Sequence, residues 1–130
     1  MSQSTILPFA EWLAGRCAFL HDLEAEAERV LHETKDTGAY KELMRQKALF
    51  LQSLPEEAEA CAFTLPAAVA EHAMRRLNGF SDNASRALSI GSVFYMYALL
   101  YPDDHIKGQP NDFDLLVSEI RSLAASEVTA

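Results

Sequence analysis

The feature of this chain that most constrains its fold is a long segment without charge, from Ala87 to Pro102. Arg86 and Asp103 flank its sixteen residues. A helix that spans a bilayer needs about twenty predominantly apolar residues, so this segment is too short to be one. A helix that is apolar on every side typically lies at the centre of a soluble bundle. We therefore expect residues 82–101 to form a central apolar helix around which the others pack.

The composition favours helices over strands. Only 5 glycines and 5 prolines occur in 130 residues, and 49% of the residues are hydrophobic, which is typical of a globular, helix-rich protein. We predict an all-α fold in which five to six helices form one compact bundle, and a single domain over residues 1–130. The terminal residues 1–6 and 127–130 are expected to be disordered.

Apolar periodicity and turn residues set the expected helix boundaries. Helices are predicted over residues 8–37, 39–53, a short stretch from the capping box at 53–56 to 62, then 64–79, 82–101, and from 111 or 112 onward. Gly79 is expected to end one helix, because glycine tolerates the left-handed conformation that closes many helices. Pro102 is expected to end the next one.

The acidic charge bears on partners and location. The net charge is −8, and an acidic protein repels phosphate backbones, so nucleic-acid binding is not expected. The N-terminal residues lack a basic region followed by a long apolar run, so we expect no secretory signal, no membrane association and a cytoplasmic location. Cys17 and Cys61 are then expected to be reduced and buried, and the sequence leaves open whether they meet. No cofactor is predicted.

Four potential metal ligands lie at helical spacing in the first predicted helix: His21, Glu24, Glu28 and His32. This spacing places them on one stripe beside the apolar face. Imidazole and carboxylate groups in such a row could bind a transition metal. The alternative is a solvated flank in which Glu28 and His32 interact, since the Glu-x-x-His pairs of dimetal bundles are absent.

A basic cluster suggests a second kind of site. Arg75 and Arg76 lie near the end of one predicted helix, and Ser81 and Arg86 lie at the start of the next. The amides of that helix start, together with the arginines, would form an anion-binding site. The alternative is structural, because arginines near a helix end complement its dipole, and Asp82 would repel an anion.

Acidic and amide side chains follow the uncharged segment. They include Asp103, Asp104, Asn111, Asp112 and Asp114. The residue pattern of the calcium-binding helix–loop–helix motif is absent. Asp and Asn favour both turns and helix caps, so we predict a structural role for these residues.

The sequence indicates a binding role more than a catalytic one. The Gly-x-Ser-x-Gly nucleophile motif and the glycine loops that cradle phosphates are absent. The leading prediction is a noncatalytic protein–protein interaction module, such as an adaptor, a regulator or a self-associating subunit. Its surplus of large apolar residues would form a face for another protein or for a second copy in a homodimer, along residues 8–37 or 82–101. In that case one side of the uncharged segment stays exposed until a partner covers it. The alternative is a bundle that binds a small ligand, an anion or a metal, and this class includes enzymes.

Overall fold

The computed structural model of the chain describes residues 4–129, and within this range it shows helices and no strands. The all-α prediction is confirmed. The described residues form five α-helices: α1 (Leu7–Arg29), α2 (Thr37–Cys61), α3 (Ala67–Ile90), α4 (Val93–Ala98) and α5 (Asp112–Thr129). A π-helical turn, Val30–Thr34, continues α1, and a 3-10 turn, Ala62–Thr64, follows α2.

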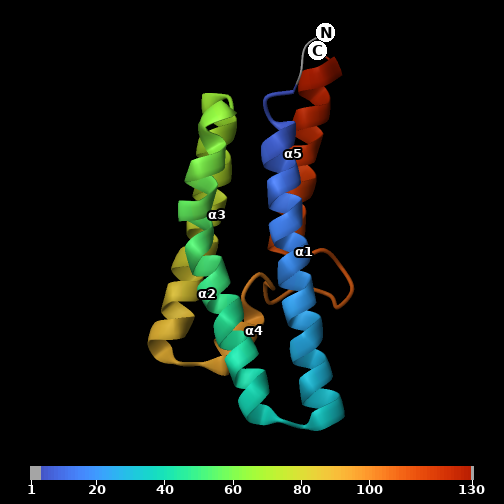
Figure 1. Ribbon diagram of the computed structural model, residues 1–130, viewed down its shortest axis with the longest axis vertical. Helices are drawn as coiled ribbons and strands as arrows, with labels where there is room; N and C mark the ends of the chain where they lie inside the picture. Colours follow the sequence, from blue (N-terminus) through green and yellow to red (C-terminus); the bar gives the residue numbers. More distant parts are fainter. Residues whose placement is uncertain (1–3, 130) are drawn as a thin grey trace.

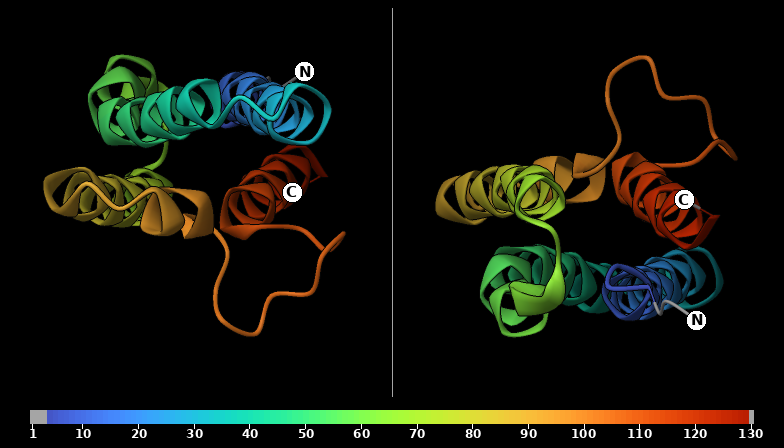
Figure 2. Two further views of the ribbon diagram at one scale, coloured as in Figure 1. Left: turned by 90° about the horizontal axis from the view of Figure 1, so that it is seen from below. Right: turned by 90° about the horizontal axis from the view of Figure 1, so that it is seen from above.

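The four long helices lie side by side and alternate in direction (Figure 1). α1 packs against α2, α2 packs against α3, and α5 contacts both α3 and α1, so the four helices form a closed ring. Seen end-on, α1 and α2 form one layer, and α3, α4 and α5 form the other (Figure 2). The start of α1 and the end of α5 therefore lie at the same end of the bundle.

Apolar residues at helical spacing fill the interior of this ring. The buried side chains include Phe9, Leu13 and Leu20 on α1, and Phe113 and Ile120 on α5. Helical spacing keeps these residues on one face of each helix, as the sequence pattern predicted. Each large side chain removed from water in this way contributes about 1.5–3 kcal/mol.

The bundle differs between its two ends. α5 begins beside the middle of α1, so it covers only one half of the ring, which we call the α5 half (Figure 1). In the other half, which we call the α4 half, the short helix α4 packs against α2 and α3. The connection over residues 99–111 loops outward before α5 begins (Figure 2). In the α4 half, a short helix and a loop consequently take the place of the fourth long helix.

The predicted helix end at residues 53–56 is wrong. α2 runs through this stretch with Pro55 inside the helix. The hydroxyl of Ser53 donates to the carbonyl oxygen of Phe50 at 2.8 Å and does not cap a new helix. A proline inside a helix costs about 3 kcal/mol. The burial of Leu54 and Ala58, which continue the inner face of α2 beyond the proline, offsets this cost.

The predicted central helix over residues 82–101 is also not present as one helix. α3 passes through Gly79, because buried alanines continue its inner face, and it ends at Gly91 instead. Gly91 adopts the left-handed conformation with φ 73°. Its amide donates to the carbonyl oxygens of Ala87 and Leu88, a common way of closing a helix. The second half of the segment forms α4, after a sharp turn.

The uncharged segment therefore does not lie at the centre of the bundle, and one of its sides is exposed. Ile90, Phe94, Tyr95 and Tyr97 are exposed by 58%, 71%, 52% and 57%. We call these four side chains the α4 face. The segment does not form a membrane span either, since no helix within residues 4–129 is both long enough and apolar enough to cross a bilayer.

The residues before α1 are held by the end of α5. Glu127 accepts hydrogen bonds from the hydroxyl of Ser4 at 2.7 Å and from the amide of Ile6 at 3.1 Å. These contacts join the two ends of the described chain. The outermost of the positions expected to be disordered, residues 1–3 and 130, lie outside the described residues.

Replacing the two glycines of α3 with alanine should change stability in opposite directions. Gly91→Ala should lower the free energy of unfolding by about 1 kcal/mol, because alanine is strained in the left-handed conformation. Gly79→Ala should raise it by about 0.5–1 kcal/mol, because alanine is the better residue inside a helix. An added Cβ meets no atom within 4 Å at either position, so new contacts do not complicate the comparison. Urea denaturation of both variants measures the two changes, and the reverse signs would contradict the observed boundaries.

Candidate functional site

A lysine is buried at the α4 half of the bundle. Lys47 lies on the inner face of α2, between Met44 and Leu51, and it is 0% exposed. Its Nζ atom lies 3.0 Å from Glu24 Oε2 and donates to the carbonyl oxygen of Tyr97 at 2.9 Å. A buried ammonium without partners costs several kcal/mol, so these two contacts are what allow the charge to be buried here.

Tyr101 completes this group of interacting side chains. Its hydroxyl lies 2.9 Å from each carboxylate oxygen of Glu24, and its ring centroid lies 5.0 Å from Nζ of Lys47. Burial lowers the pKa of Lys47, although Glu24 opposes this shift. Burial also raises the pKa of Tyr101, against a lowering by Asn111, and Glu24 adds to the rise. We call Glu24, Lys47 and Tyr101 the buried polar network, and it joins α1, α2 and the chain after α4.

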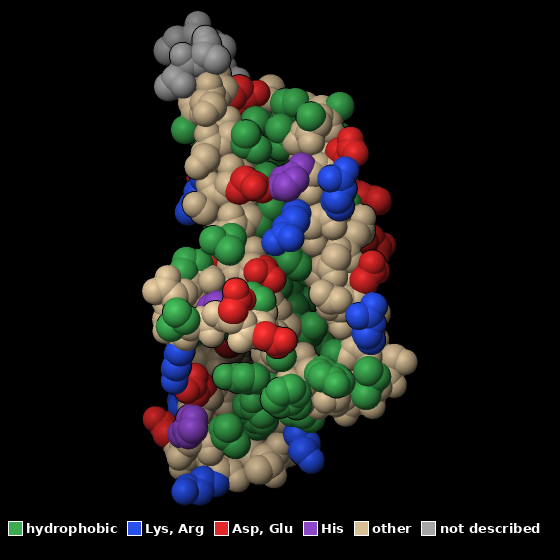
Figure 3. Space-filling view, turned by 180° about the vertical axis from the view of Figure 1, so that it is seen from behind, with side chains coloured by type: hydrophobic (Ala, Val, Ile, Leu, Met, Phe, Trp, Pro, Cys, Tyr) green, Lys and Arg blue, Asp and Glu red, His purple; other side chains and the backbone are tan. Residues whose placement is uncertain are grey.

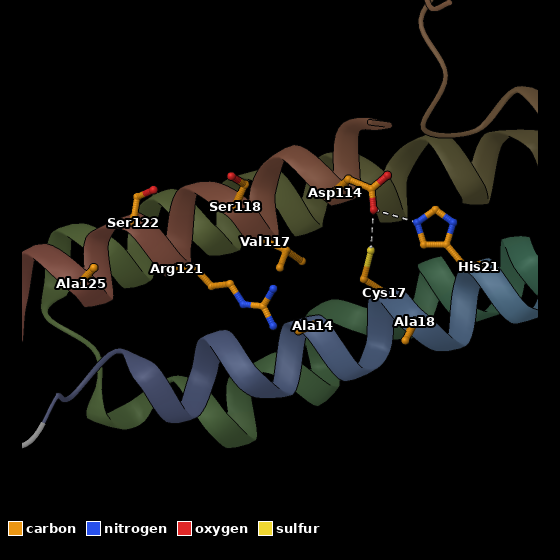
Figure 4. A pocket seen from close by; sticks show the side chains of 10 residues that line it. All are labelled: Ala14, Cys17, Ala18, His21, Asp114, Val117, Ser118, Arg121, Ser122 and Ala125. Atoms are coloured by element: carbon orange, nitrogen blue, oxygen red, sulfur yellow. Dashed lines mark hydrogen bonds and ion pairs between the residues drawn. The ribbon is translucent and has the colours of Figure 1, made fainter. Parts of the chain in front are cut away.

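A second cluster lies at the junction of α1 and α5 (Figure 4). The thiol of Cys17 donates to Asp114 Oδ1 at 3.2 Å, and His21 Nε2 lies 2.7 Å from the same oxygen. We call Cys17, His21 and Asp114 the α1–α5 cluster. Asp114 is held by Asn111 in a reciprocal cap: the Asn111 amide donates to Oδ2 at 2.9 Å, and the Asp114 amide donates to Asn111 Oδ1 at 2.8 Å. A groove of about 600 Å³ opens beside the cluster.

The thiol of this cluster is held in its protonated form. Burial raises the pKa of Cys17 to about 12, and the hydrogen bond to Asp114 adds to the shift. Burial also pushes the pKa of Asp114 upward, but hydrogen bonds from His21, the Asn111 amide and Cys17 outweigh it and hold this pKa below its usual range. The thiolate is the nucleophilic form, so Cys17 is not poised as a nucleophile at neutral pH. Cys17 and Cys61 are both free thiols, and Cys61 is only half-buried.

The row of residues predicted as metal ligands does not converge on one point. His21 belongs to the α1–α5 cluster, and its Nδ1 atom lies 3.8 Å from Glu24 Oε1. Glu24 belongs mainly to the buried polar network. Glu28 and His32 face each other at 3.7 Å on the exposed side of the helix, as in the solvated alternative. Among the described residues, three potential ligand atoms come together in the α1–α5 cluster, and His21 is the one member of the predicted row that belongs to it.

The predicted anion site has no helix start. α3 is continuous through Ser81, so its amides are used within the helix, and the Ser81 hydroxyl donates to a carbonyl oxygen of α2 at 3.0 Å. Arg75 pairs with a glutamate one turn earlier at 2.7 Å. The guanidinium carbon of Arg76 lies 5.5 Å from the centroid of an aromatic ring. Arg86 lies further along α3, where it lines a groove together with Ile90 and Tyr95. The free amides that the anion site required are therefore missing.

Sequence patterns missed Lys47 and the full role of Asp114. Lys47 occupies a position in the apolar stripe of α2, and a charge in such a stripe is the signal that could have identified it. Asp114 was expected to have a structural role as one of a group of turn and cap residues, and it forms a reciprocal cap with Asn111. Its contact with Cys17 spans 97 positions in sequence, so no local pattern carries it.

The fold defines a class, the antiparallel helical bundle, and similarity adds nothing further. No known protein family, no curated protein and no solved structure matches the chain.

Breaking the buried ion pair from one side should cost more than removing it as a whole. Glu24→Gln leaves the ammonium of Lys47 buried without its carboxylate, and we expect it to lower the free energy of unfolding by about 3 kcal/mol. Adding Lys47→Met to this variant should recover part of the loss, because no charge is then buried. Urea denaturation of the two single variants and the double variant measures the coupling.

Glu28→Gln is the matched control, since Glu28 is exposed and should contribute less than about 0.5 kcal/mol. Strictly additive losses in the double variant, or an equal loss from the control, would contradict the role given to the ion pair.

Proposed function

We propose that this protein is a noncatalytic protein–protein interaction module, which binds a partner chain through the α4 face. The exposure of Ile90, Phe94, Tyr95 and Tyr97 carries the proposal. Figure 3 shows the side of the molecule formed by α3, α4 and α5. Hydrophobic side chains gather on its α4 half. Contiguous apolar patches are uncommon on monomeric proteins, and aromatic residues are enriched where proteins bind one another.

A groove beside the α4 face gives a partner a place to insert. The groove is lined by Phe94 and Tyr97 of α4 and by Leu31 of the π-helical turn. Its volume is about 390 Å³, which suits one or two large side chains of a partner helix. Glu28 and Lys107, whose exposed side chains lie 3.9 Å apart, also line the groove. An apolar floor with charged groups of both signs around it is the usual composition of a protein-binding groove.

The α4 face is presented on a backbone that is held in place. Ser92 caps α4 by accepting a hydrogen bond from the Tyr95 amide at 3.1 Å. Met96 points inward and is buried. Lys47 holds the carbonyl oxygen of Tyr97 at 2.9 Å. A face that is ordered before binding loses less entropy when a partner docks, which favours affinity.

Photo-crosslinking in the native host tests this proposal. A photoreactive phenylalanine analogue replaces Phe94, and the same group replaces Glu57 of α2 as an exposed control outside the α4 face. We expect a discrete adduct from position 94 and none from position 57. Tyr95→Ser and Tyr97→Ser, introduced together, should remove the adduct without changing the circular dichroism spectrum, because both side chains are more than half exposed.

The composition of the adduct identifies the partner. An adduct of two copies indicates a homodimer, and a different protein indicates an adaptor or a regulator. The absence of a discrete adduct from position 94, or the same adducts from position 57, would overturn the proposal.

A further inference from the structure

The α1–α5 cluster has the chemistry of a transition-metal site. Cys17 and His21 lie four residues apart on one face of α1, so both side chains point at the first turn of α5 (Figure 4). The sulfur, the imidazole nitrogen and a carboxylate oxygen of Asp114 all lie within 4.8 Å of one another. Magnesium and calcium prefer oxygen ligands alone, whereas a set of sulfur, nitrogen and oxygen suits zinc.

Two of the three separations between ligand atoms can be compared with those of a tetrahedral zinc site. Zinc lies about 2.0–2.3 Å from such ligands, so neighbouring ligand atoms are separated by roughly 3.2–3.7 Å. The sulfur of Cys17 is already 3.2 Å from Asp114 Oδ1. His21 Nε2 is 2.7 Å from the same oxygen, and it must move back by about half an ångström. The side chains of His21 and Asp114 are 47% and 28% exposed, so they have room for this adjustment.

Neighbouring residues hold the three potential ligands in position. Asn111 fixes the carboxylate of Asp114 through the reciprocal cap. Glu24 Oε1 lies 3.8 Å from Nδ1 of His21, on the side away from Asp114. Histidines that bind metals usually donate their second ring nitrogen to a carboxylate or carbonyl group. Glu24 would have to approach by about half an ångström to accept such a hydrogen bond. Glu24 is in turn fixed by the buried polar network.

We propose that Cys17, His21 and Asp114 bind a zinc-class metal ion, with a fourth coordination position open to the groove between α1 and α5. Ala14, Ala18 and Val117, which also line the groove, offer no side-chain ligand, whereas Ser118 offers a hydroxyl group. Arg121 lines the groove as well, and its positive charge lowers the pKa of Cys17, against the larger effect of burial. Three protein ligands with one open position are typical of zinc sites that bind water or a substrate group. The metal replaces the thiol proton of Cys17, which passes to solvent. This site is separate from the α4 face and does not depend on it.

Titration of the metal-free protein with cobalt(II), a spectroscopic substitute for zinc, tests the site. We expect one ion per chain and a thiolate-to-cobalt charge-transfer band in the near ultraviolet. Cys17→Ser should abolish this band. His21→Gln and Asp114→Asn should each weaken cobalt binding by about tenfold or more. Zinc(II) added to the cobalt-loaded protein should displace the cobalt. Zinc(II) added alone to the metal-free, unaltered protein should raise its thermal unfolding temperature, because the ion binds the folded form.

Matched controls separate this site from adventitious binding. Cys61→Ser removes the other thiol, His72→Gln removes a histidine that pairs with Glu119 elsewhere, and Asp112→Asn alters a neighbouring carboxylate of α5. All three should bind cobalt as the parent does. A parent protein without the charge-transfer band, or a band that survives Cys17→Ser, would overturn the proposal. The shift of unfolding temperature with zinc is measured on the unaltered chain, so the test does not depend on any variant folding well.

Discussion

The buried ion pair between Lys47 and Glu24 is the constraint on which the α4 half of the bundle depends. α4 spans only Val93–Ala98, and a helix of this length is not stable in water on its own. The last carbonyl groups of any helix also lack partners within the helix. Lys47 supplies a partner for one of them, at Tyr97, from the interior of the neighbouring helix. The buried ammonium group of Lys47 thus stabilises α4, which is too short to be stable alone.

Glu24 links the two regions to which functions are assigned. On one side its carboxylate contacts Lys47 and Tyr101, which support α4. On the other side it approaches His21 in the α1–α5 cluster. His21 and Glu24 lie one turn apart on α1, near the level at which α5 gives way to α4 and a loop. The buried polar network and the α1–α5 cluster therefore lie next to each other, at the transition between the two halves of the bundle.

Sequence periodicity predicted the class of fold and the inner faces of the helices, but it did not predict where α3 ends. Local sequence does not distinguish Gly79 from Gly91 as a helix end. The two positions differ in how deeply the neighbouring side chains are buried. Phe80, directly after Gly79, is buried against an aromatic ring of α5 with 5.9 Å between ring centroids, whereas Ser89 and Ile90, directly before Gly91, are exposed. Lys47 was visible in the sequence as a charge within an apolar stripe. To predict that Asp114 lies beside α1, one must know that α5 packs against α1, and local sequence patterns do not contain this information.

The contacts between the N-terminal part of the chain and α5, which we call the seam, also bear on the order in which the helices pack during folding. α1, α2 and α3 follow one another through short turns, so their contacts are local and close early. The seam joins Cys17 to Asp114 across 97 positions and Ser4 to Glu127 across 123 positions. Contacts of such long range form only after the intervening chain has been gathered. We therefore expect the α1–α5 cluster to be among the last contacts to form, because the hydrogen bond from Cys17 to Asp114 requires α5 to be docked.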